Sequence, residues 1–337
     1  MEKQAIISGK DIEIGYSKSK HKNITSLYKH LSFDLYKGEL VCLLGVNGAG
    51  KSTLLRTISN SQPALNGDIL LQEKNISSYS EKELSKLLGL VLTDKTSTGG
   101  LLVKELVELG RYPYSGFFGI INQEDKNIIA KAMSDVGIAH KANSYMAELS
   151  DGERQKAMIA KVLAQECPII ILDEPTAFLD IESRMEIMNL LHTLAQDQGK
   201  TILLSTHDID LAFLLADRLW LLSKEGGLVT GITEEVILSG KIDTFFSKEN
   251  VVFNRNTGNF RPKKKTSRNV YLQADEEKYY WIKNMIERYG FAVMEKDNNI
   301  LFSIIFDNNN SFSIATKDEK IINLKGFEQL ADFLKSN

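Results

Sequence analysis

The stretch LLGVNGAGKST, residues 43–53, joins the end of an apolar run over 39–45 to the start of a helical pattern over 51–60. Glycines let a backbone turn so that successive N–H groups point at phosphate oxygens, with the positive end of the next helix behind them. The spacing G-x-x-x-x-G-K-[ST] of a phosphate-binding loop, in its required strand-to-helix setting, is met by Gly45, Gly50, Lys51 and Ser52.

The side chains of this loop have separate expected roles. Lys51 reaches the β- and γ-phosphates, Ser52 offers its hydroxyl to Mg²⁺, and Thr53 adds a phosphate contact. Asn47 and Gly48 complete the part of the loop that surrounds the nucleotide. The alternative, a structural turn of this composition, is less favoured. The stretch therefore predicts a nucleotide site.

A carboxylate at the end of a buried strand is expected to complete such a site. The apolar run 169–172 leads directly into Asp173 and Glu174. Asp173 would hold Mg²⁺ through water, and Glu174 would be the general base that polarises the attacking water. A strand that ends in Asp-Glu is a weak signal alone. Together with the loop it is a strong one.

Short apolar runs alternate with helical patterns along most of the chain. Runs of four to six apolar or β-branched residues closed by Gly, Asp, Ser or Thr are typical of strands buried on both faces. The pattern predicts an α/β fold with a mostly parallel sheet, plus an antiparallel edge from the segment before residue 33. The predicted strands are 39–45, 88–93, 168–174, 201–206 and 218–223, and the predicted helices are 51–60, 81–88, 122–136, 153–166, 182–198 and 208–216.

The overall composition is that of an ordinary soluble globular protein. The chain has 337 residues, 43% of them hydrophobic and 25% charged, and a net charge of -3 that gives no general attraction to nucleic acid or anionic membranes. Cys42 and Cys167 lie beside apolar runs, which predicts buried thiols in a reduced setting. The sequence has neither a signal-peptide pattern nor an apolar run of the ~18 residues that a spanning helix needs. We therefore expect a cytoplasmic protein.

The composition changes near residue 254. The segment 254–269 is polar, contains a proline and carries five basic residues from Arg261 to Arg268, so it is predicted to be a basic linker. Before it we expect an ATPase domain over 1–253, with a helical subdomain at about 95–165.

After the linker, residues 270–337 are predicted to form a small α+β domain. Its expected elements are a strand, a helix at 275–289, two or three more short strands and a final helix at 326–335. It has 8 basic and 11 acidic residues, a net charge of -3. It contains no metal-ligand cluster, glycine loop or nucleophile constellation, which suits a regulatory or dimer-bracing accessory domain.

Four segments resemble, in sequence and order, the nucleotide-binding subunits of ATP-binding cassette (ABC) transporters. The resemblance covers about residues 5–250 and implies an ATPase cassette with ATP and Mg²⁺ as cofactors. The segments are the loop, LSDGERQ (149–155), IIILDEPTAFLD (169–180) and STHD (205–208).

The resemblance also implies a head-to-tail homodimer. Ser150 and Gly152 correspond to the family's signature segment, whose helix N-terminus faces the γ-phosphate held by the other protomer. Helix-end N–H groups can stabilise the charge of a transferring phosphoryl group. Two such composite sites need two copies of the chain.

Three further residues take their roles from the same resemblance. His207 is similar to the switch residue that contacts the γ-phosphate, although a histidine there could also be a structural cap. Asp180 resembles the aspartate of the loop that crosses the dimer interface. Tyr16 resembles the aromatic residue that stacks on adenine, with an ordinary packed tyrosine as the alternative.

The sequence departs from the family pattern at two places. Asp94 occupies the position where a glutamine usually binds Mg²⁺ and couples the site to the membrane partner. This shorter, charged side chain predicts altered coupling. The signature segment has Asp151 and Glu153 where Gly and Gln are commoner, and an acidic group near a γ-phosphate is unfavourable unless it points away.

The segment LVELGRYPY (106–114) resembles importer ATPases for iron-siderophore, haem and cobalamin uptake. By that resemblance the surface from Asp94 to Tyr114 docks a membrane permease on the inner face of the cell membrane. The permease receives its substrate from an extracytoplasmic binding protein, and the sequence of this chain does not identify that substrate. In the alternative interpretation, Arg111 and Pro113 only cap a helix of the helical subdomain.

A second hypothesis is a soluble cassette ATPase that acts on ribosomes or nucleic acid. Such members carry two cassettes or long heptad coils, and this chain has neither. The basic run at 261–268 keeps the hypothesis open, although a solvated linker is favoured. A GTP-specific switch protein is a third option, but this sequence lacks the Asn-Lys-x-Asp motif with which such proteins recognise the base.

Overall fold

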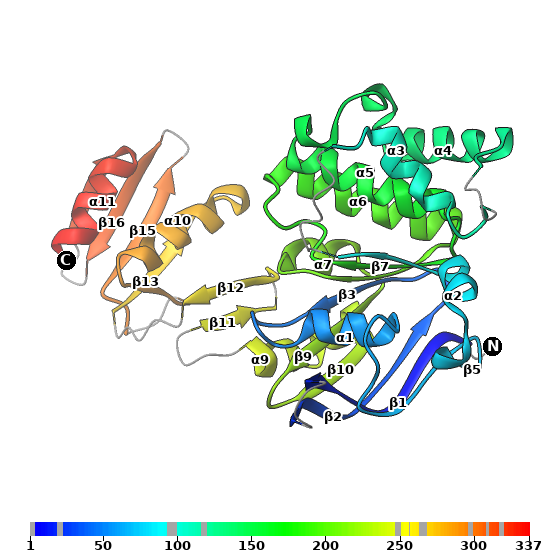
Figure 1. The fold of residues 1–337 in the computed structure, drawn as a ribbon. Coiled ribbons are helices and arrows are strands. Elements are labelled where there is room, and N and C mark those ends of the chain that lie inside the picture. The colour runs from blue at the N-terminus through cyan, green and yellow to red at the C-terminus, as the bar shows by residue number, and fades with distance from the viewer. Residues whose placement is uncertain are drawn as a thin grey trace. The chain divides into compact units, whose positions relative to one another are not determined.

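A six-stranded sheet with the order β10-β9-β3-β8-β7-β6 organises the first part of the chain (Figure 1). Neighbouring strands from β9 to β6 pair in parallel, and β10 alone among the six is antiparallel to its neighbour. The mostly parallel sheet expected from the sequence is therefore confirmed. Its strands are β3 (Leu40–Leu44), β6 (Leu88–Val91), β7 (Ile169–Asp173), β8 (Thr201–Ser205), β9 (Arg218–Ser223) and β10 (Gly227–Ile232).

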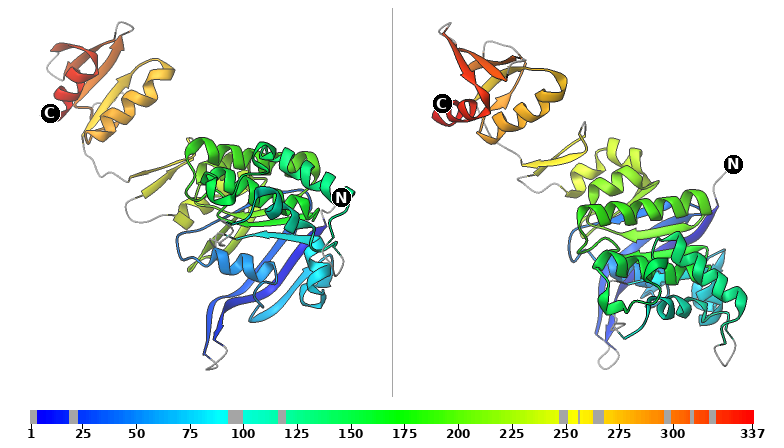
Figure 2. Two further views of the ribbon diagram at one scale, coloured as in Figure 1. Left: turned by 45° about the horizontal axis from the view of Figure 1, so that its top comes forward. Right: turned by 90° about the horizontal axis from the view of Figure 1, so that it is seen from above.

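The central strands are buried on both faces, as their continuous apolar runs predict. In β3, Cys42 belongs to a core shared with the helices on one face, whereas Val41 belongs to a core shared with α1 and the second sheet. Figures 1 and 2 show α5 and α6 together on one side of the sheet. The helices are α1 (Lys51–Ile58), α2 (Glu81–Leu87), α3 (Val103–Glu108), α4 (Gln123–Asp135), α5 (Asp151–Ala164), α6 (Ile181–Gln198), α7 (Ile209–Leu215), α8 (Thr233–Leu238) and α9 (Lys241–Phe246).

The expected antiparallel edge is a separate four-stranded sheet with the order β2-β1-β4-β5. Its long β1–β2 pair contains several register shifts. The sheet packs through Ile7, Ile14 and Phe33 against the core that also contains β3 and α1. Its strands are β1 (Ala5–Lys18), β2 (Asn23–Tyr36), β4 (Asn66–Leu71) and β5 (Lys74–Asn75).

Short 3₁₀ turns complete this unit: Ile76–Ser78, Leu109–Arg111, Ala139–Lys141 and Met146–Glu148. The helix expected at 153–166 begins earlier, at Asp151. The reason is a capping box, in which Ser150 accepts a hydrogen bond from the Glu153 amide and Glu153 accepts one from the Ser150 amide. Local capping therefore sets this boundary.

The segment expected to be an open linker begins as a strand pair. Strand β11 (Val251–Asn254) pairs with β12 (Asn259–Pro262). Phe253 and Phe260 have ring centroids 5.0 Å apart, and they contact Phe213 and Phe246. Aromatic burial thus holds residues 253–260 on the first unit. The polar composition of 254–269 concealed this pair.

The chain forms two compact units, one of residues 1–247 with 253–260 and the other of residues 248–252 with 261–337. The second unit has a five-stranded sheet with the order β14-β13-β15-β16-β17. Buried residues of both helices, such as Ile282 and Leu330, share one core with one face of this sheet. Its elements are β13 (Asn269–Gln273), α10 (Glu276–Arg288), β14 (Ala292–Val293), β15 (Phe302–Asp307), β16 (Ser311–Thr316), β17 (Ile321–Lys325) and α11 (Gly326–Ser336).

These statements come from a computed structural model. No helix among its described residues is long and apolar enough to cross a membrane. Asp94 and the lysines at 263–265 lie outside the described residues, as do parts of the expected permease-docking surface and of the basic linker. The described residues are 4–18, 23–92, 100–115, 120–246, 251–255, 257–262, 268–295, 299–307, 310–316 and 320–337.

Candidate functional site: a nucleotide-binding cassette

The candidate site lies at one edge of the parallel sheet, where three neighbouring strands end. Strand β8 lies between β3 and β7, and Ser205 at its end is in register with Leu43 on one side and Asp173 on the other. The carboxyl ends of parallel strands meet at one edge, which is the usual ligand position in open α/β sheets. The loops after β3, β7 and β8 carry Lys51, Glu174 and His207 to this edge.

Three charged or titratable side chains meet there. Glu174 Oε1 lies 2.6 Å from His207 Nε2 and 3.6 Å from Lys51 Nζ. Lys51 Nζ lies 3.1 Å from His207 Nε2, and it donates a hydrogen bond to the carbonyl of Gly45. The structure therefore brings together three residues from widely separated parts of the chain.

The Lys51 side chain is only 4% exposed. Burial lowers the pKa of its ammonium group, and the nearby carboxylates of Glu174 and Asp173 oppose that shift. A buried ammonium group at the end of a glycine-rich loop is suited to receive a polyphosphate, because the phosphate charge replaces the lost solvation.

The backbone at Glu174 is held in an unusual conformation. Its φ of 50° lies in the left-handed region, which a side-chain-bearing residue rarely adopts. The Glu174 amide donates hydrogen bonds to the Ser205 hydroxyl, at 2.9 Å, and to the Ser205 carbonyl, at 3.2 Å. Strain of this kind clusters at active sites.

Ser205 is a residue of the site that sequence reasoning missed. Its side chain is fully buried, and its hydroxyl donates to Asp173 Oδ1 at 2.7 Å. The same hydroxyl accepts from the Glu174 amide. It therefore orients both acidic residues at once. The quoted segment STHD begins with this serine, but its register opposite Asp173 follows from the strand order.

The phosphate-binding loop has the backbone that its glycines permit. Gly50 precedes α1 with φ 91° and ψ 16°, a conformation that favours glycine. A Cβ on Gly45 would approach the Leu222 carbonyl to 2.6 Å, so that position is restricted by strand β9. Asn47 and Gly48 are exposed at the tip of the loop, and Ser52 is partly buried.

Tyr16 lies beside this loop. Its hydroxyl is 2.7 Å from Thr53 Oγ1, and the residue is 48% exposed. Tyr16 comes from β1 and Thr53 from α1, so the contact joins the antiparallel sheet to the helix behind the loop. An exposed ring in this place fits a stacking surface for a base better than a core tyrosine does.

Ser150 and Gly152 of the signature segment lie at the N-terminus of α5, and Asp180 lies at the N-terminus of α6. Asp180 caps α6 by accepting from the Ser183 amide at 2.7 Å, which lowers the pKa of its carboxyl group. A Cβ on Gly152 would lie 3.0 Å from the Ser183 hydroxyl. Ser183 thus links the two helix ends that carry Ser150, Gly152 and Asp180.

The two acidic residues of the signature segment are both paired. Asp151 forms an ion pair with Arg154 at 2.7 Å. Glu153 folds back onto the Ser150 amide and pairs with Lys141 at 3.1 Å, and these hydrogen bonds lower the pKa of its carboxyl group. Within one copy of the chain, their charges are thus already compensated.

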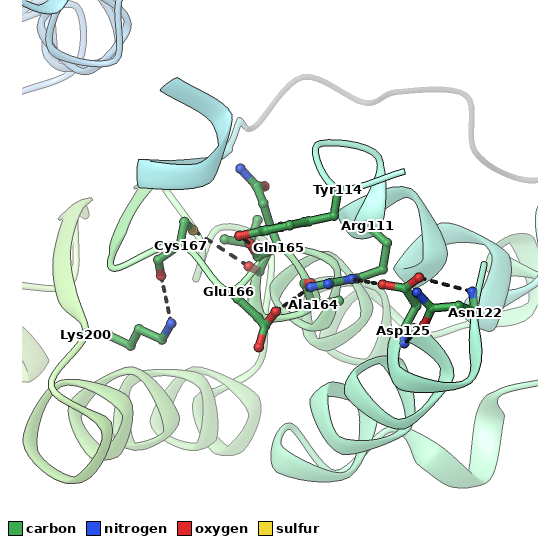
Figure 3. A network of polar contacts seen from close by, with 10 residues as sticks. Arg111, Tyr114, Asn122, Asp125, Ala164, Gln165, Glu166, Cys167 and Lys200 are labelled. Carbon is green, nitrogen blue, oxygen red and sulfur yellow. Dashed lines mark hydrogen bonds and ion pairs between the residues drawn. The ribbon is translucent and has the colours of Figure 1, made fainter. Parts of the chain in front are cut away.

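Arg111 of the GRYPY segment is buried in a polar network (Figure 3). It contacts Asp125 Oδ1 at 2.8 Å, Glu166 Oε2 at 2.6 Å and the Ala164 carbonyl at 2.8 Å. Its guanidinium carbon lies 4.2 Å from the centre of the Tyr114 ring. The network joins the α3 region to the N-terminus of α4 and the C-terminus of α5.

Hard oxygen donors are available for a magnesium ion. Ser52 supplies a hydroxyl at the start of α1, and Asp173 supplies a carboxylate at the end of β7. Oxygen ligands of this type suit Mg²⁺, which binds one or two carboxylates and keeps several waters. The donor set therefore fits the ion.

The parallel sheet, the phosphate-binding loop and the acidic strand end together define a P-loop nucleotide-binding cassette. Comparison with family models agrees: residues 28–177 match the ABC transporter model, and residues 267–335 match the iron ABC transporter C-terminal domain. The chain belongs to the ATP-binding proteins of ABC transporters and is an ATPase of that family.

Two curated relatives and one solved cassette illustrate the likeness. The ferric enterobactin transport ATP-binding protein FepC of Escherichia coli K12 is 35% identical over 73% of this chain and 88% of its own. The iron(3+)-hydroxamate import ATP-binding protein FhuC of Bacillus subtilis 168 is 35% identical over 63% of this chain and 80% of its own. The bacterial ABC transporter cassette MJ0796, solved as a dimer and also with ADP and Pi bound, aligns with a TM-score of 0.59 at 27% identity, over 67% of this chain and 98% of its own.

Proposed function

We propose that this chain powers the uptake of an iron complex, either a siderophore chelate or haem, or of cobalamin. The observation that carries the proposal is the match of residues 267–335 to an iron ABC transporter C-terminal domain, on the same chain as a cassette whose relatives are named for ferric siderophores. Among the candidate substrates, those names favour a ferric siderophore.

In the proposed reaction, the amides of the loop and Lys51 bind the β- and γ-phosphates of ATP. Glu174 accepts a proton from the attacking water, and His207 contacts the γ-phosphate. The close approach of Lys51, Glu174 and His207 supports these roles. Binding of ATP exchanges the Lys51–Glu174 pair for a Lys51–phosphate pair, which leaves Glu174 free to act as a base.

Ser52 and Asp173 would hold Mg²⁺ in this scheme, with Asp173 acting through water. The ion would supply charge neutralisation at the phosphates. The Ser205 hydroxyl donates to the Asp173 carboxylate and so holds this proposed metal ligand in place.

The catalytic unit is proposed to be a head-to-tail homodimer. Each site would receive Ser150 and Gly152 from the other copy, and Asp180 would lie near the interface. Support comes from the dimeric cassette MJ0796 and from the linked N-termini of α5 and α6. Phe178 is 83% and Ile181 80% exposed beside Asp180, so apolar surface is available there to contact a second copy.

A membrane permease is proposed to dock on the surface between Asp94 and Tyr114. Of the described residues there, Tyr112 is 79% and Leu109 50% exposed, while Arg111 beneath them is buried. In this proposal the chain lies in the cytoplasm, on the inner face of the membrane, and an extracytoplasmic binding protein supplies the substrate to the permease.

Reconstitution tests this function. The tagged chain would be purified from its own cells together with its permease, and the complex would be inserted into liposomes. The vesicle lumen would contain the binding protein with a ferric siderophore, haem or cobalamin. Phosphate release would then be measured for each substrate. We expect stimulation by one iron chelate. Stimulation by none of the three classes, from a complex that hydrolyses ATP, would contradict the proposed substrate.

The nucleic-acid alternative gains no support from the comparisons, which give transporter proteins. The same preparation can test it directly. Neutralising Lys263, Lys264 and Lys265 should leave ATP hydrolysis and transport unchanged, and the wild-type chain should not shift a labelled nucleic acid in low salt.

A further inference from the structure

Tyr28 lies behind the phosphate-binding loop. It belongs to β2 and is 7% exposed. Its hydroxyl donates a 2.6 Å hydrogen bond to the carbonyl of Ala49, the residue before Gly50. Burial raises the pKa of this phenol, so it stays protonated and remains a donor.

The contact fixes the direction of one backbone amide. The Ala49 carbonyl and the Gly50 N–H belong to the same peptide group, and the described chain contains no cis peptide bond. In a planar trans peptide these two groups point in opposite directions. A carbonyl held against Tyr28 therefore aims the Gly50 N–H away from β2, toward the opposite side of the loop.

A second contact limits the same peptide group. Gly50 has φ 91°, and a Cβ there would lie 3.3 Å from Cε2 of the Tyr28 ring. The Ala49 amide in turn donates to the Val46 carbonyl at 3.0 Å. The ring excludes alternative positions of Gly50 while the hydroxyl holds the carbonyl. Glycine by itself would leave this peptide free to rotate.

We propose that Tyr28 is a positioning residue for ATP binding, which presets the Gly50 amide to donate to a phosphate oxygen. The inference rests on residues 45–53 being the phosphate-binding loop. The preset Gly50 amide need not be ordered when the nucleotide binds, so Tyr28 strengthens binding without itself touching the ligand. Nothing in the loop spacing itself calls for a tyrosine at position 28.

The test compares two variants that each remove one tyrosine hydroxyl from a backbone carbonyl. Tyr28→Phe breaks the bond to Ala49. Tyr79→Phe breaks a 2.9 Å bond to the Leu71 carbonyl in the same unit, away from the loop. Both should lower the midpoint of thermal unfolding to a similar extent. The measurements are the dissociation constant for ADP and the kcat and KM for ATP, taken well below that midpoint.

We expect Tyr28→Phe to raise the ADP dissociation constant and the KM for ATP about three- to tenfold, with kcat within about twofold, as for the loss of one hydrogen bond. Tyr79→Phe should change neither constant. Equal nucleotide affinity in wild type and Tyr28→Phe would overturn the inference. If Tyr28→Phe does not fold, Tyr28→Leu, which also lacks the hydroxyl, takes its place as the test variant.

Lys51→Ala separates this failure from a failure of the loop assignment. If Lys51→Ala binds ADP as wild type does, residues 45–53 are not the phosphate site. If Lys51→Ala loses binding while Tyr28→Phe behaves like Tyr79→Phe, the loop assignment stands and only the role of Tyr28 is wrong.

Discussion

The cassette contains two clusters of charge that are built in opposite ways. At the sheet edge, Lys51, Glu174 and His207 approach one another from three loops, and Glu174 remains 27% exposed. In the helical region, Arg111 makes short contacts to Asp125 and Glu166, to a helix-terminal carbonyl and to a tyrosine ring. The first cluster has a Lys51–Glu174 pair at 3.6 Å that a ligand can replace. In the second cluster, groups of the chain itself already bind the Arg111 guanidinium.

The difference shows how burial of charge serves binding in one place and folding in another. A buried charge is tolerated only when it is paired. The Arg111 network is paired by the chain itself, so it stabilises the fold without a ligand. Lys51 is paired less closely, at 3.6 Å, and the polyphosphate is the better partner. Binding energy and fold stability should therefore respond to different substitutions.

Glu174→Gln should give the largest effect. The amide keeps the shape of the side chain but cannot accept a proton, so ATP hydrolysis should fall by about a thousandfold. ATP should still bind, and the closed dimer should persist. Phosphate release and gel filtration with ATP and magnesium measure the two properties.

Glu81→Gln is the matched control for that variant, because Glu81 is exposed in the first turn of α2, away from the proposed dimer interface. It should hydrolyse ATP at the wild-type rate. Normal turnover in Glu174→Gln would remove Glu174 from the proposed mechanism and leave the sheet-edge cluster without its base.

Arg111→Met should act on stability. It leaves Asp125 buried without its cation, so the free energy of unfolding should fall by about 3–5 kcal/mol, measured with urea. Lys131→Met, which breaks an exposed ion pair with Asp135, should change it by less than about 0.5 kcal/mol. A small loss of unfolding free energy in Arg111→Met would mean that the Arg111 network does not stabilise the fold.

At acid pH, the difference in the free energy of unfolding between Arg111→Met and wild type should become smaller. Hydrogen bonding to Arg111 lowers the pKa of Asp125 in the folded chain. A lowered native pKa contributes stability above the unfolded value of about 3.9, and this contribution is lost as the pH falls through the native value. The stability gap should thus be constant near neutral pH and narrow below about pH 4. A gap independent of pH would contradict this pairing.

Ser205→Ala should have an intermediate effect on catalysis. It removes the hydroxyl that joins Asp173 Oδ1 to the Glu174 amide, so both acidic groups lose orientation. We expect kcat to fall by about tenfold, comparable to a misplaced catalytic group. Ser239→Ala, which removes a hydroxyl that donates to the Val236 carbonyl at the end of α8, serves as a control for the loss of a serine hydroxyl. Unchanged kcat in Ser205→Ala would show that β7 alone orients the pair.

Removal of residues 262–337 should have the smallest effect. It leaves both charge clusters and most of the β11–β12 pair intact, so basal ATP hydrolysis should stay within about twofold of wild type. A shorter chain ending at 252 also loses Phe253 and Phe260, and it should be less stable. Loss of hydrolysis in the longer truncation would show that the C-terminal unit supports the site.

Sequence reasoning succeeded where a feature depends on neighbouring residues. The strands at 169–173 and 201–205 and the helix at 51–58 lie within two residues of their predicted bounds, because continuous apolar runs and the glycine loop are local patterns. It was less successful at β12 and β17. The first is a polar strand held by phenylalanines distant in sequence, and the second is an exposed edge strand of mixed polarity.

The chemical identity of the site was determined by the sequence, because the spacing of Gly45, Gly50 and Lys51 and the acidic end of β7 specify phosphate and metal binding locally. The tertiary structure decided which side chains serve that site. Ser205 gains its place opposite Asp173 only through the strand order β3-β8-β7, and Tyr28 reaches Ala49 only through the packing of β2 on the loop. Such contacts join residues far apart in the chain, so only the folded structure can bring them together.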